Sequence, residues 1–192
     1  TELNDLAMKA RFRVQVEADA DEANWTASGY DQVAYLFAAN PGEPLGPVEK
    51  IASGGELSRV MLALKATVEA GAASSGRQLR TENRELRTGF RTLIFDELDT
   101  GIGGRAAEAV GRKLKALARG NQVLCITHLP QIAALADHHY VVEKLEAGGR
   151  TRTHIRRLSE AERTEELARM LSGARLTETS RRHAQQLLKA NP

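Results

Sequence analysis

Stretches of apolar residues, some alternating with polar ones and some continuous, divide the N-terminal part of the chain into elements. Apolar and polar positions alternate over Phe12–Val16, and a second apolar stretch covers Tyr30–Ala39, which predicts two strands. The Pro/Gly-rich segment NPGEPLGP then predicts an extended loop. Residues 1–10 have apolar side chains at helical spacing, and they predict the end of an amphipathic helix.

A longer helix is predicted from Ser53 to about Ala72. Ser53 can cap its N-terminus, and Glu56, three residues later, completes a capping-box pattern. The apolar residues predicted to form its buried face are Leu57, Val60, Met61, Ala63, Leu64 and Val68. The segment that follows, residues 71–91, is polar and rich in Gly, Ser, Arg and Thr, which predicts a flexible insertion.

Strand and helix patterns alternate over residues 92–145, which predicts an α/β fold with a mostly parallel sheet flanked by helices. The elements predicted from residue 92 onward are strands at Thr92–Phe95, Gln122–Thr127, His139–Leu145 and Thr151–Leu158, and helices at Gly104–Ala118, Leu129–Ala136, Ser159–Leu171 and Glu178–Lys189. The last two strands are expected to pair around the EAGGR turn.

Composition and charge place the chain among ordinary soluble globular proteins. Of its 192 residues 42% are hydrophobic and 27% charged, and a net charge of +2 is too small to indicate a nucleic-acid or membrane partner. The single cysteine, Cys125, excludes an internal disulfide framework and fits a reducing compartment. The sequence has no apolar run near the ~20 residues of a membrane span, and its N-terminus lacks a signal-peptide pattern.

An apolar strand that ends in two acids is the strongest local signal for catalysis. Leu93–Glu97 has the sequence LIFDE. Asp96 offers the hard oxygen ligand that Mg²⁺ prefers, directly or through water, and Glu97 can orient and deprotonate a water that attacks a γ-phosphate. Taken alone, however, a solvated acidic turn at a strand end is the more common explanation of such residues.

A histidine is predicted at the same sheet edge. Ile126–Leu129 has the sequence ITHL, so His128 follows the next parallel strand and is expected near Asp96 and Glu97. An imidazole there can contact a γ-phosphate or the attacking water. A lone histidine at a strand end is more often structural, but its pairing with the acids about thirty residues earlier favours a functional role.

The sequence SGGE, residues 53–56, opens the long predicted helix. The exposed amides of a helix N-terminus and a serine hydroxyl together form an anion site, and glycines allow a close approach of the backbone. Alone, SGGE is better explained as a capped helix without a ligand. The SGGE, LIFDE and ITH motifs in this order are much more specific than any one of them.

In this order the motifs resemble the C-terminal half of an ABC-type ATPase head. The resemblance assigns Ser53, Gly54, Gly55 and Glu56 to the signature motif, Leu93–Glu97 to the Walker B strand with catalytic Glu97, Leu98–Gly101 to the D-loop and His128 to the switch histidine. Within that superfamily the match is close to the RecN family, SMC-like proteins of bacterial DNA double-strand-break repair. The matching segments are FAANPGEPLGPVEKIASGGELSRVMLALK, IFDELDTGIGGRAAEAVGRKL and CITHLPQIAALADHHYVVEK.

This resemblance implies a dimer of heads that encloses two ATP molecules, with Mg²⁺ at Asp96. Residues 53–56 of one head would contact the γ-phosphate bound by the other, and Asp99 in the D-loop would lie at the junction and couple the two sites. The implied partners are an N-terminal Walker A lobe of the same protein, a second head in a homodimer, DNA and other recombination proteins. The implied location is the bacterial cytoplasm, at the nucleoid and not at a membrane.

No glycine in this chain is followed by lysine, so the phosphate loop of such ATPases is missing from it. The chain is therefore expected to be a piece of a longer protein: residues 1–10 as the end of a coiled-coil helix, and residues 11–192 as the C-terminal lobe of the head. Alone, this piece is expected not to hydrolyse ATP.

Two other functions fit parts of the pattern. A transporter's nucleotide-binding subunit is disfavoured by SGGE in place of the common LSGGQ and by the ELDTGIGG run, and a non-catalytic scaffold is disfavoured by the intact Asp96, Glu97 and His128. Arginines in and beside the insertion form a candidate DNA-binding edge, although a solvated surface explains them more simply. They are Arg77, Arg80, Arg84, Arg87 and Arg91.

Four further patterns are set aside. GIGGRA, residues 101–106, matches a dinucleotide-binding fingerprint but lacks the acid at the next strand end, so its glycines are assigned to a tight turn. Cys125 is expected to be an inert core residue. Asp137–His139 are consecutive residues that cannot easily converge on one metal ion, and Trp25 and Tyr30 are expected to be packing residues.

Overall fold

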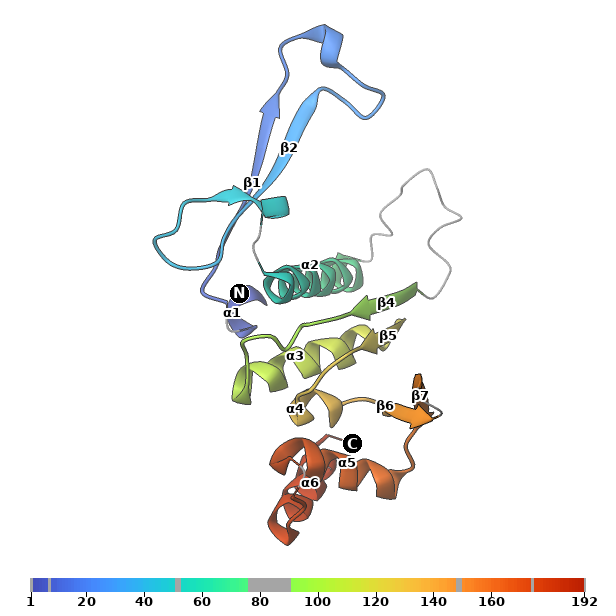
Figure 1. Ribbon diagram of the computed structural model, residues 1–192. Coiled ribbons are helices and arrows are strands. Elements are labelled where there is room, and N and C mark those ends of the chain that lie inside the picture. The colour runs from blue at the N-terminus through green and yellow to red at the C-terminus, as the bar shows by residue number, and fades with distance from the viewer. Residues whose placement is uncertain are drawn as a thin grey trace.

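The computed structural model describes residues 2–6, 8–50, 53–75, 91–147, 150–173 and 175–191 (Figure 1). Its α-helices are α1 Glu2–Asp5, α2 Gly54–Ser75, α3 Gly104–Leu117, α4 Pro130–Ala133, α5 Glu160–Ser172 and α6 Glu178–Ala190. Its strands are β1 Arg11–Ala18, β2 Asp31–Ala38, β3 Gly46–Pro47, β4 Arg91–Phe95, β5 Asn121–Cys125, β6 Tyr140–Ala147 and β7 Arg150–Arg157. Two 3₁₀ turns, η1 Glu22–Asn24 and η2 Val48–Lys50, complete these elements.

The strands form three separate sheets among the described residues. β4 and β5 pair in parallel, whereas β1-β2-β3 and β6-β7 are antiparallel. The prediction of a mostly parallel sheet therefore holds only for β4 and β5, which are connected through helix α3. β6 and β7 are close in sequence, and a short connection can join strands only in antiparallel fashion.

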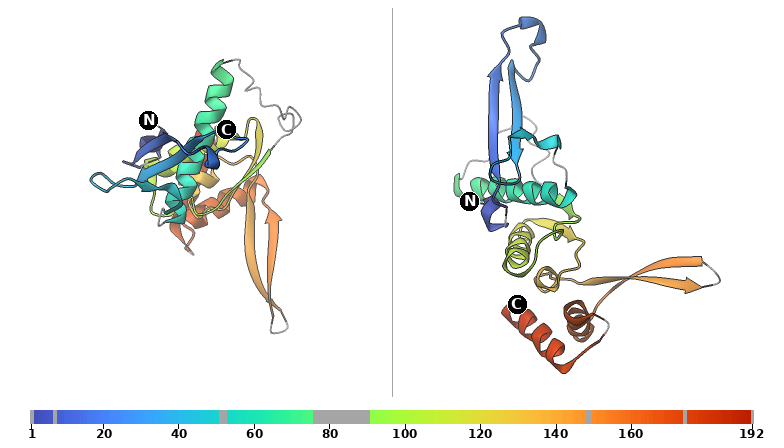
Figure 2. Two further views of the ribbon diagram at one scale, coloured as in Figure 1. Left: turned by 90° about the horizontal axis from the view of Figure 1, so that it is seen from above. Right: turned by 60° about the vertical axis from the view of Figure 1, so that its left-hand side comes forward.

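The main core lies around the β4–β5 pair. One face of this pair, with Leu93, Phe95 and Val123, packs against helix α3, and the same core contains residues of α1, α2 and α4. Helix α2 lies between the β1–β2 hairpin and the layer formed by β4, β5 and α3 (Figure 1). Helices α4, α5 and α6 share a second, smaller core, and the β1–β2 and β6–β7 hairpins project from the body in different directions (Figure 2).

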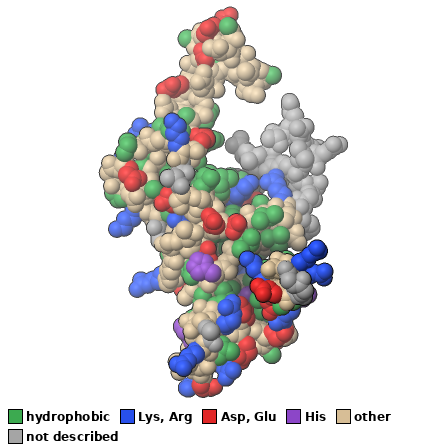
Figure 3. All heavy atoms as spheres, in the orientation of Figure 1, with side chains coloured by type: hydrophobic (Ala, Val, Ile, Leu, Met, Phe, Trp, Pro, Cys, Tyr) green, Lys and Arg blue, Asp and Glu red, His purple; other side chains and the backbone are tan. Residues whose placement is uncertain are grey.

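The predicted buried face of α2 is only partly correct. Val60 packs with Met8 and Phe37, and Ala63 lies in the main core, as expected, but Leu62 is also fully buried there. The buried residues share one side of α2, and the predicted stripe of Leu57, Met61, Leu64 and Val68 lies on the other side and is exposed. This stripe and exposed apolar side chains of the β4–β5 pair account for much of the hydrophobic surface in the middle of the molecule (Figure 3).

Two of the predicted segments at element boundaries differ from the structure. Only Glu2–Asp5 of residues 1–10 is helical, and Leu6 and Met8 fill the cores beside it. Of the predicted insertion at 71–91, residues 71–75 belong to α2 and Arg91 opens β4, while residues 76–90 lie outside the described residues. Helix α5 begins at its predicted N-terminus, where Ser159 and Glu162 form a complete capping box.

Each of the three sheets leaves apolar side chains bare on one face. On β1 and β2 these are Val14, Val16, Val33 and Tyr35; on and beside β4 and β5 they are Ile94, Leu124 and Ile126; on β6 and β7 they are Tyr140, Val142 and Ile155. The continuous apolar run of β4 is typical of a strand buried on both faces, but in this chain Ile94 is 69% exposed. Only the side of β4 that faces α3 is covered. No helix in the described part of the chain is long and apolar enough to span a membrane.

Candidate functional site

The parallel pairing of β4 and β5 brings the predicted acids and the histidine to one edge. Phe95 pairs with Cys125, and the Ile126 N–H donates to the Phe95 carbonyl at 3.0 Å, so the two chains continue side by side beyond the strands. Asp96 and Glu97 leave one strand at this edge, and Thr127 and His128 leave the other. The structure therefore places Asp96, Glu97 and His128 together, as the sequence predicts.

Asp99 is the centre of the hydrogen bonding at this edge. Its side chain is 4% exposed, and one oxygen, Oδ2, accepts from Thr127 Oγ1 at 2.6 Å and from the His128 N–H at 2.7 Å. The same oxygen lies 2.8 Å from His128 Nδ1. The Asp99 carboxylate points inward and holds His128. The place of Asp99 at a junction between heads, which the resemblance implies, stays a prediction.

The surroundings of Asp99 favour its charged form. Burial raises the pKa of this carboxyl, but hydrogen bonds from Thr127 and the His128 N–H, together with the nearby His128 ring, outweigh burial and bring the pKa below its ordinary 3.8. A carboxylate beside Nδ1 favours the imidazole tautomer with its proton on that nitrogen. The His128 side chain is 73% exposed, so Nε2 can accept a hydrogen bond from a group outside this chain.

Glu97 has a strained backbone. Its φ is +58°, and it has the only positive φ at a non-glycine position among the described residues. This conformation costs about 1–2 kcal/mol for a residue with a Cβ. Two contacts hold it: the Glu97 N–H donates to Asp96 Oδ1 at 3.0 Å, and the Thr100 N–H donates to the Glu97 carbonyl at 3.2 Å. Strain of this kind collects at functional sites, and no sequence pattern revealed it.

The SGGE segment begins α2 directly against this loop of the same chain. The Glu56 N–H donates to Ser53 Oγ at 3.5 Å. This long hydrogen bond is one of the two that the predicted capping box requires. A Cβ on Gly54 would lie 2.9 Å from Glu97 Oε2, and one on Gly55 would lie 2.8 Å from both the Glu97 carbonyl oxygen and Thr100 Cβ. Packing within the chain therefore requires a glycine at position 55, whereas at position 54 the end of the Glu97 side chain could move aside. The phosphate contact that sequence reasoning assigned to both glycines stays a prediction.

Sequence reasoning missed two residues of α2 that bond to the same loop. Ser58 Oγ donates to the Asp96 carbonyl at 3.0 Å, and buried Arg59 donates to carbonyls farther along the loop. The spacing of Arg59 could have revealed it, because Arg59 precedes the buried pair Leu62 and Ala63 by three and four residues and so shares their helix face.

The candidate DNA-binding edge lies largely outside the described residues. Arg77, Arg80, Arg84 and Arg87 fall within residues 76–90, so the structure does not test them. Arg91 is exposed at the first position of β4, at the opposite end of that strand from Asp96. The DNA-binding assignment remains a prediction.

Three of the patterns that were set aside behave as expected. Burial, and then the negative charges of Asp99 and Asp96, raise the pKa of the Cys125 thiol to about 12, so this thiol is protonated and unreactive at neutral pH. Gly101 and Gly104 have φ values of +73° and +53°, which fits the tight turn. Asp137–His139 do not converge, since Asp137 pairs with Lys115 and His138 contacts the Arg157 guanidinium.

Trp25 and Tyr30 are packing residues only in a limited sense. Their ring centroids lie 5.5 Å apart beyond the ends of β1 and β2, and both side chains are half exposed. The end of the hairpin that carries them projects away from the helices of the molecule (Figure 1).

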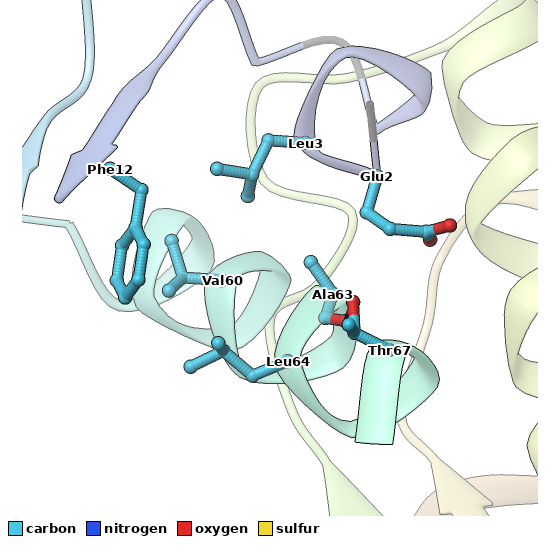
Figure 4. Close-up of a pocket in the computed structure, with 7 residues that line it drawn as sticks. All are labelled: Glu2, Leu3, Phe12, Val60, Ala63, Leu64 and Thr67. Atoms are coloured by element: carbon cyan, nitrogen blue, oxygen red, sulfur yellow. Dashed lines mark hydrogen bonds between the residues drawn. The ribbon is translucent and has the colours of Figure 1, made fainter. Parts of the chain in front are cut away.

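Two pockets in the described part of the chain lie away from this edge. One of about 200 Å³ lies between α1, β1 and α2 and is lined mainly by apolar side chains such as Leu3, Phe12 and Val60 (Figure 4). Another, of about 420 Å³, lies between the β6–β7 hairpin and α5. The candidate site itself is an exposed edge of the molecule, since Asp96 and Glu97 are exposed and the His128 side chain is 73% exposed.

The edge fits part of a magnesium nucleotide site. Asp96 is exposed and directs Oδ1 to the Glu97 N–H, and its other oxygen has no hydrogen-bond donor among the described residues. A free carboxylate oxygen suits Mg²⁺. In the described part of the chain no three His, Cys, Asp or Glu side chains gather as they do around a metal ion, so Asp96 would supply one ligand of several.

Comparison with known proteins identifies relatives of this chain. No family model matches it. It is 42% identical over 181 residues to the DNA repair protein RecN of Halalkalibacterium halodurans, and the aligned region covers 94% of this chain and 29% of that protein. It is 47% identical over 179 residues to the DNA repair protein RecN of Deinococcus radiodurans, and the aligned region covers 93% of this chain and 28% of that protein.

A solved structure shares the fold. The Smc head domain with a coiled coil and joint from Pyrococcus yayanosii aligns with a TM-score of 0.51 and 19% identity, over 86% of this chain and 27% of that one. The chain thus shares the fold of this head domain, which confirms the predicted α/β lobe. The chain spans less than a third of the length of the curated relatives described above. Over that span, the chain is similar to DNA repair proteins of the RecN family.

Proposed function

We propose that this chain is the C-terminal lobe of an ATP-hydrolysing, SMC-like head that acts in the repair of DNA double-strand breaks. One observation carries the proposal: Asp96, Glu97, the Asp99–His128 pair and the SGGE helix start share one exposed edge. The identity of 39–47% to proteins named DNA repair protein RecN supports the repair context.

Each residue of the edge has a chemical role in this proposal. Asp96 would bind Mg²⁺, which when bound neutralises charge on the phosphates. Glu97 orients the attacking water and accepts its proton, while His128, held at Nδ1 by Asp99, directs Nε2 toward the phosphate or that water. The start of α2 presents the N–H groups of Gly54 and Gly55 to the γ-phosphate bound by a second head, which gives the helix dipole a negative charge to stabilise.

A second lobe of the same protein would complete this one. The chain has no phosphate loop, and the sheets leave apolar faces bare, including Ile94, Leu124 and Ile126 beside the acidic edge. Apolar faces of this extent are usually covered in a folded protein. An N-terminal lobe with the Walker A loop would cover the β4–β5 face and bring the β- and γ-phosphates to Asp96.

Two completed heads would then associate around ATP, and hydrolysis would release them. In this arrangement the 1–10 segment ends a coiled coil, the protein works in the bacterial cytoplasm at the nucleoid, and DNA and other recombination proteins are its partners. Binding of DNA by the arginines at 77–91 would weaken steeply with salt, and it would lose that dependence when they are neutralised.

Replacement of Glu97 by Gln in the full-length protein tests the proposal. The amide keeps the size of the side chain but cannot accept the proton, so ATP is expected to bind and to trap a dimer while turnover falls about 100-fold or more. Glu160→Gln, at an exposed acid that opens α5, is the matched control and is expected to change neither turnover nor dimerisation. Unchanged turnover in the Glu97→Gln protein would refute the catalytic assignment.

The chain by itself is expected to lack activity. Without a phosphate loop it should show no ATP turnover, whereas mixing it with the N-terminal lobe should restore nucleotide-dependent association. Turnover by the pure 192-residue chain would contradict the assignment of the phosphate site to another lobe.

A further inference from the structure

Helix α2 and the loop that follows β4 are joined at several points. This loop, residues 96–100 with the sequence DELDT, contains the proposed Mg²⁺ ligand, the proposed base and Asp99. Gly55 approaches the Glu97 carbonyl oxygen and Thr100 Cβ so closely that no Cβ fits there, and Gly54 lies beside the Glu97 side chain. Ser58 Oγ donates to the Asp96 carbonyl at 3.0 Å. The first turns of α2 therefore contact nearly the whole DELDT loop.

Arg59 makes the most buried of these connections. It is 7% exposed, and its Nη1 donates to the Leu98 carbonyl at 3.2 Å and to the Thr100 carbonyl at 2.8 Å. A guanidinium remains charged in proteins, so both bonds are charge-assisted. Burial lowers the pKa of Arg59, and the charge of Glu56 on the same helix partly offsets this effect.

The two carbonyls that Arg59 binds lie on either side of Asp99. Because the main chain is held at Leu98 and at Thr100, the Asp99 carboxylate between them has a restricted position. That carboxylate accepts from Thr127 Oγ1 and the His128 N–H and lies beside His128 Nδ1. A continuous series of polar contacts thus runs from α2 through Arg59 and the DELDT loop to His128.

We propose that Arg59 is a positioning residue that couples the SGGE helix to the hydrolytic edge of the same chain. Arg59 does so by holding the DELDT loop, and through it Asp99 and His128, at a fixed place relative to α2. This inference rests on the proposed function, in which the start of α2 contacts the nucleotide of the second head. Movement of α2 on that contact is then transmitted to Glu97 and His128, so each site responds to the occupancy of the other.

A second arginine of the chain offers a matched control. Arg163 on α5 is also partly buried, and its Nη2 donates to the carbonyls of Ala133, Ala134 and Ala136 at the end of α4. Arg163 thus makes the same kind of bond in the smaller core, away from the DELDT loop. Arg163→Met and Arg59→Met each remove hydrogen bonds from a guanidinium to main-chain carbonyls. Only the bonds of Arg59 connect through the DELDT loop to His128.

The first measurement is steady-state ATP turnover of the full-length protein. Arg59→Met is expected to lower kcat about 100-fold, the cost of a misplaced catalytic group, while KM for ATP changes by less than about threefold. Arg163→Met is expected to leave kcat within about threefold of the wild type at equal folded fraction. Arg59→Lys keeps the charge and a donor, so it should recover part of kcat, and it replaces the Met variant if that protein does not fold.

The second measurement needs no turnover. Amide hydrogen exchange of His128 reports its bond to Asp99 directly, and it is expected to accelerate in Arg59→Met but not in Arg163→Met. Equal effects of the two variants on kcat or on this exchange rate would overturn the role of Arg59. Failure of the proposed function would give a different result: the wild-type protein would show no ATP turnover, or the Glu97→Gln protein would show full turnover. In either case the exchange rate of the His128 amide would still decide whether Arg59 positions His128.

Discussion

Removal of the Asp99 carboxylate is the sharpest test of the described site. In Asp99→Ala, Thr127 Oγ1 and the His128 N–H lose an acceptor at 2.6 Å and 2.7 Å in a position that is only 4% exposed. Hydrogen bonds to a charged group contribute about 1.5–3 kcal/mol each. The His128 ring is 73% exposed, so its pairing with Asp99 adds little to stability. The expected loss is therefore about 3–5 kcal/mol in the free energy of unfolding.

Urea unfolding of the 192-residue chain, followed by far-UV circular dichroism, measures this loss. Asp137→Ala is the matched control, because Asp137 is 63% exposed and its pair with Lys115 is expected to contribute less than about 1 kcal/mol. Asp99→Asn keeps one carbonyl acceptor and should cost about 1–2 kcal/mol. The reasoning is refuted if Asp99→Ala costs no more than Asp137→Ala.

The stability difference between the wild type and Asp99→Ala should depend on pH in one direction. The pKa of Asp99 is lower in the folded chain than its ordinary value of 3.8, so the unfolded chain binds a proton more readily. The stabilisation by Asp99 is therefore fully present above that value and is lost as pH falls below it. The difference in the free energy of unfolding between the wild type and Asp99→Ala should become smaller only below this pH.

Two further predictions follow from the cited pKa values. Because the pKa of Cys125 is raised to about 12, iodoacetamide should alkylate the folded chain far more slowly than the urea-unfolded chain at neutral pH, and equal rates would contradict the burial of this thiol. Hydrogen bonds from the Ser159 main chain and side chain, and then from Arg156, lower the pKa of Glu162 from 4.5 to about 2. The stabilising effect of the Glu162 carboxylate should be lost as pH falls from 4.5 to about 2. Glu162→Gln should therefore remove the pH dependence of the urea midpoint over this range. An unaltered pH profile in this variant would show that the capping box does not titrate there.

Much of the fold was predictable because its signals are local. The alternation of β1, the continuous apolar run of β4 and the Ser159–Glu162 cap are each encoded within a few neighbouring residues. The same holds for the acids after β4 and for His128 after β5, since parallel strands place their carboxyl ends at one edge. Where the predictions were wrong, as for the exposed stripe of α2 and the bare face of β4, the outcome depends on which surfaces other elements cover.

By itself, then, the sequence determined the elements, the family resemblance and the identity of the residues at the acidic edge, because residue type and spacing along the chain are sufficient for these. Only the tertiary structure decided that Asp99 points inward to His128, that Glu97 has a left-handed backbone, and that Arg59 bonds across to Leu98 and Thr100. The contacts of Asp99 and of Arg59 join residues about thirty to forty positions apart. No periodic pattern specifies such contacts, because they arise from the distance and direction at which packed elements meet.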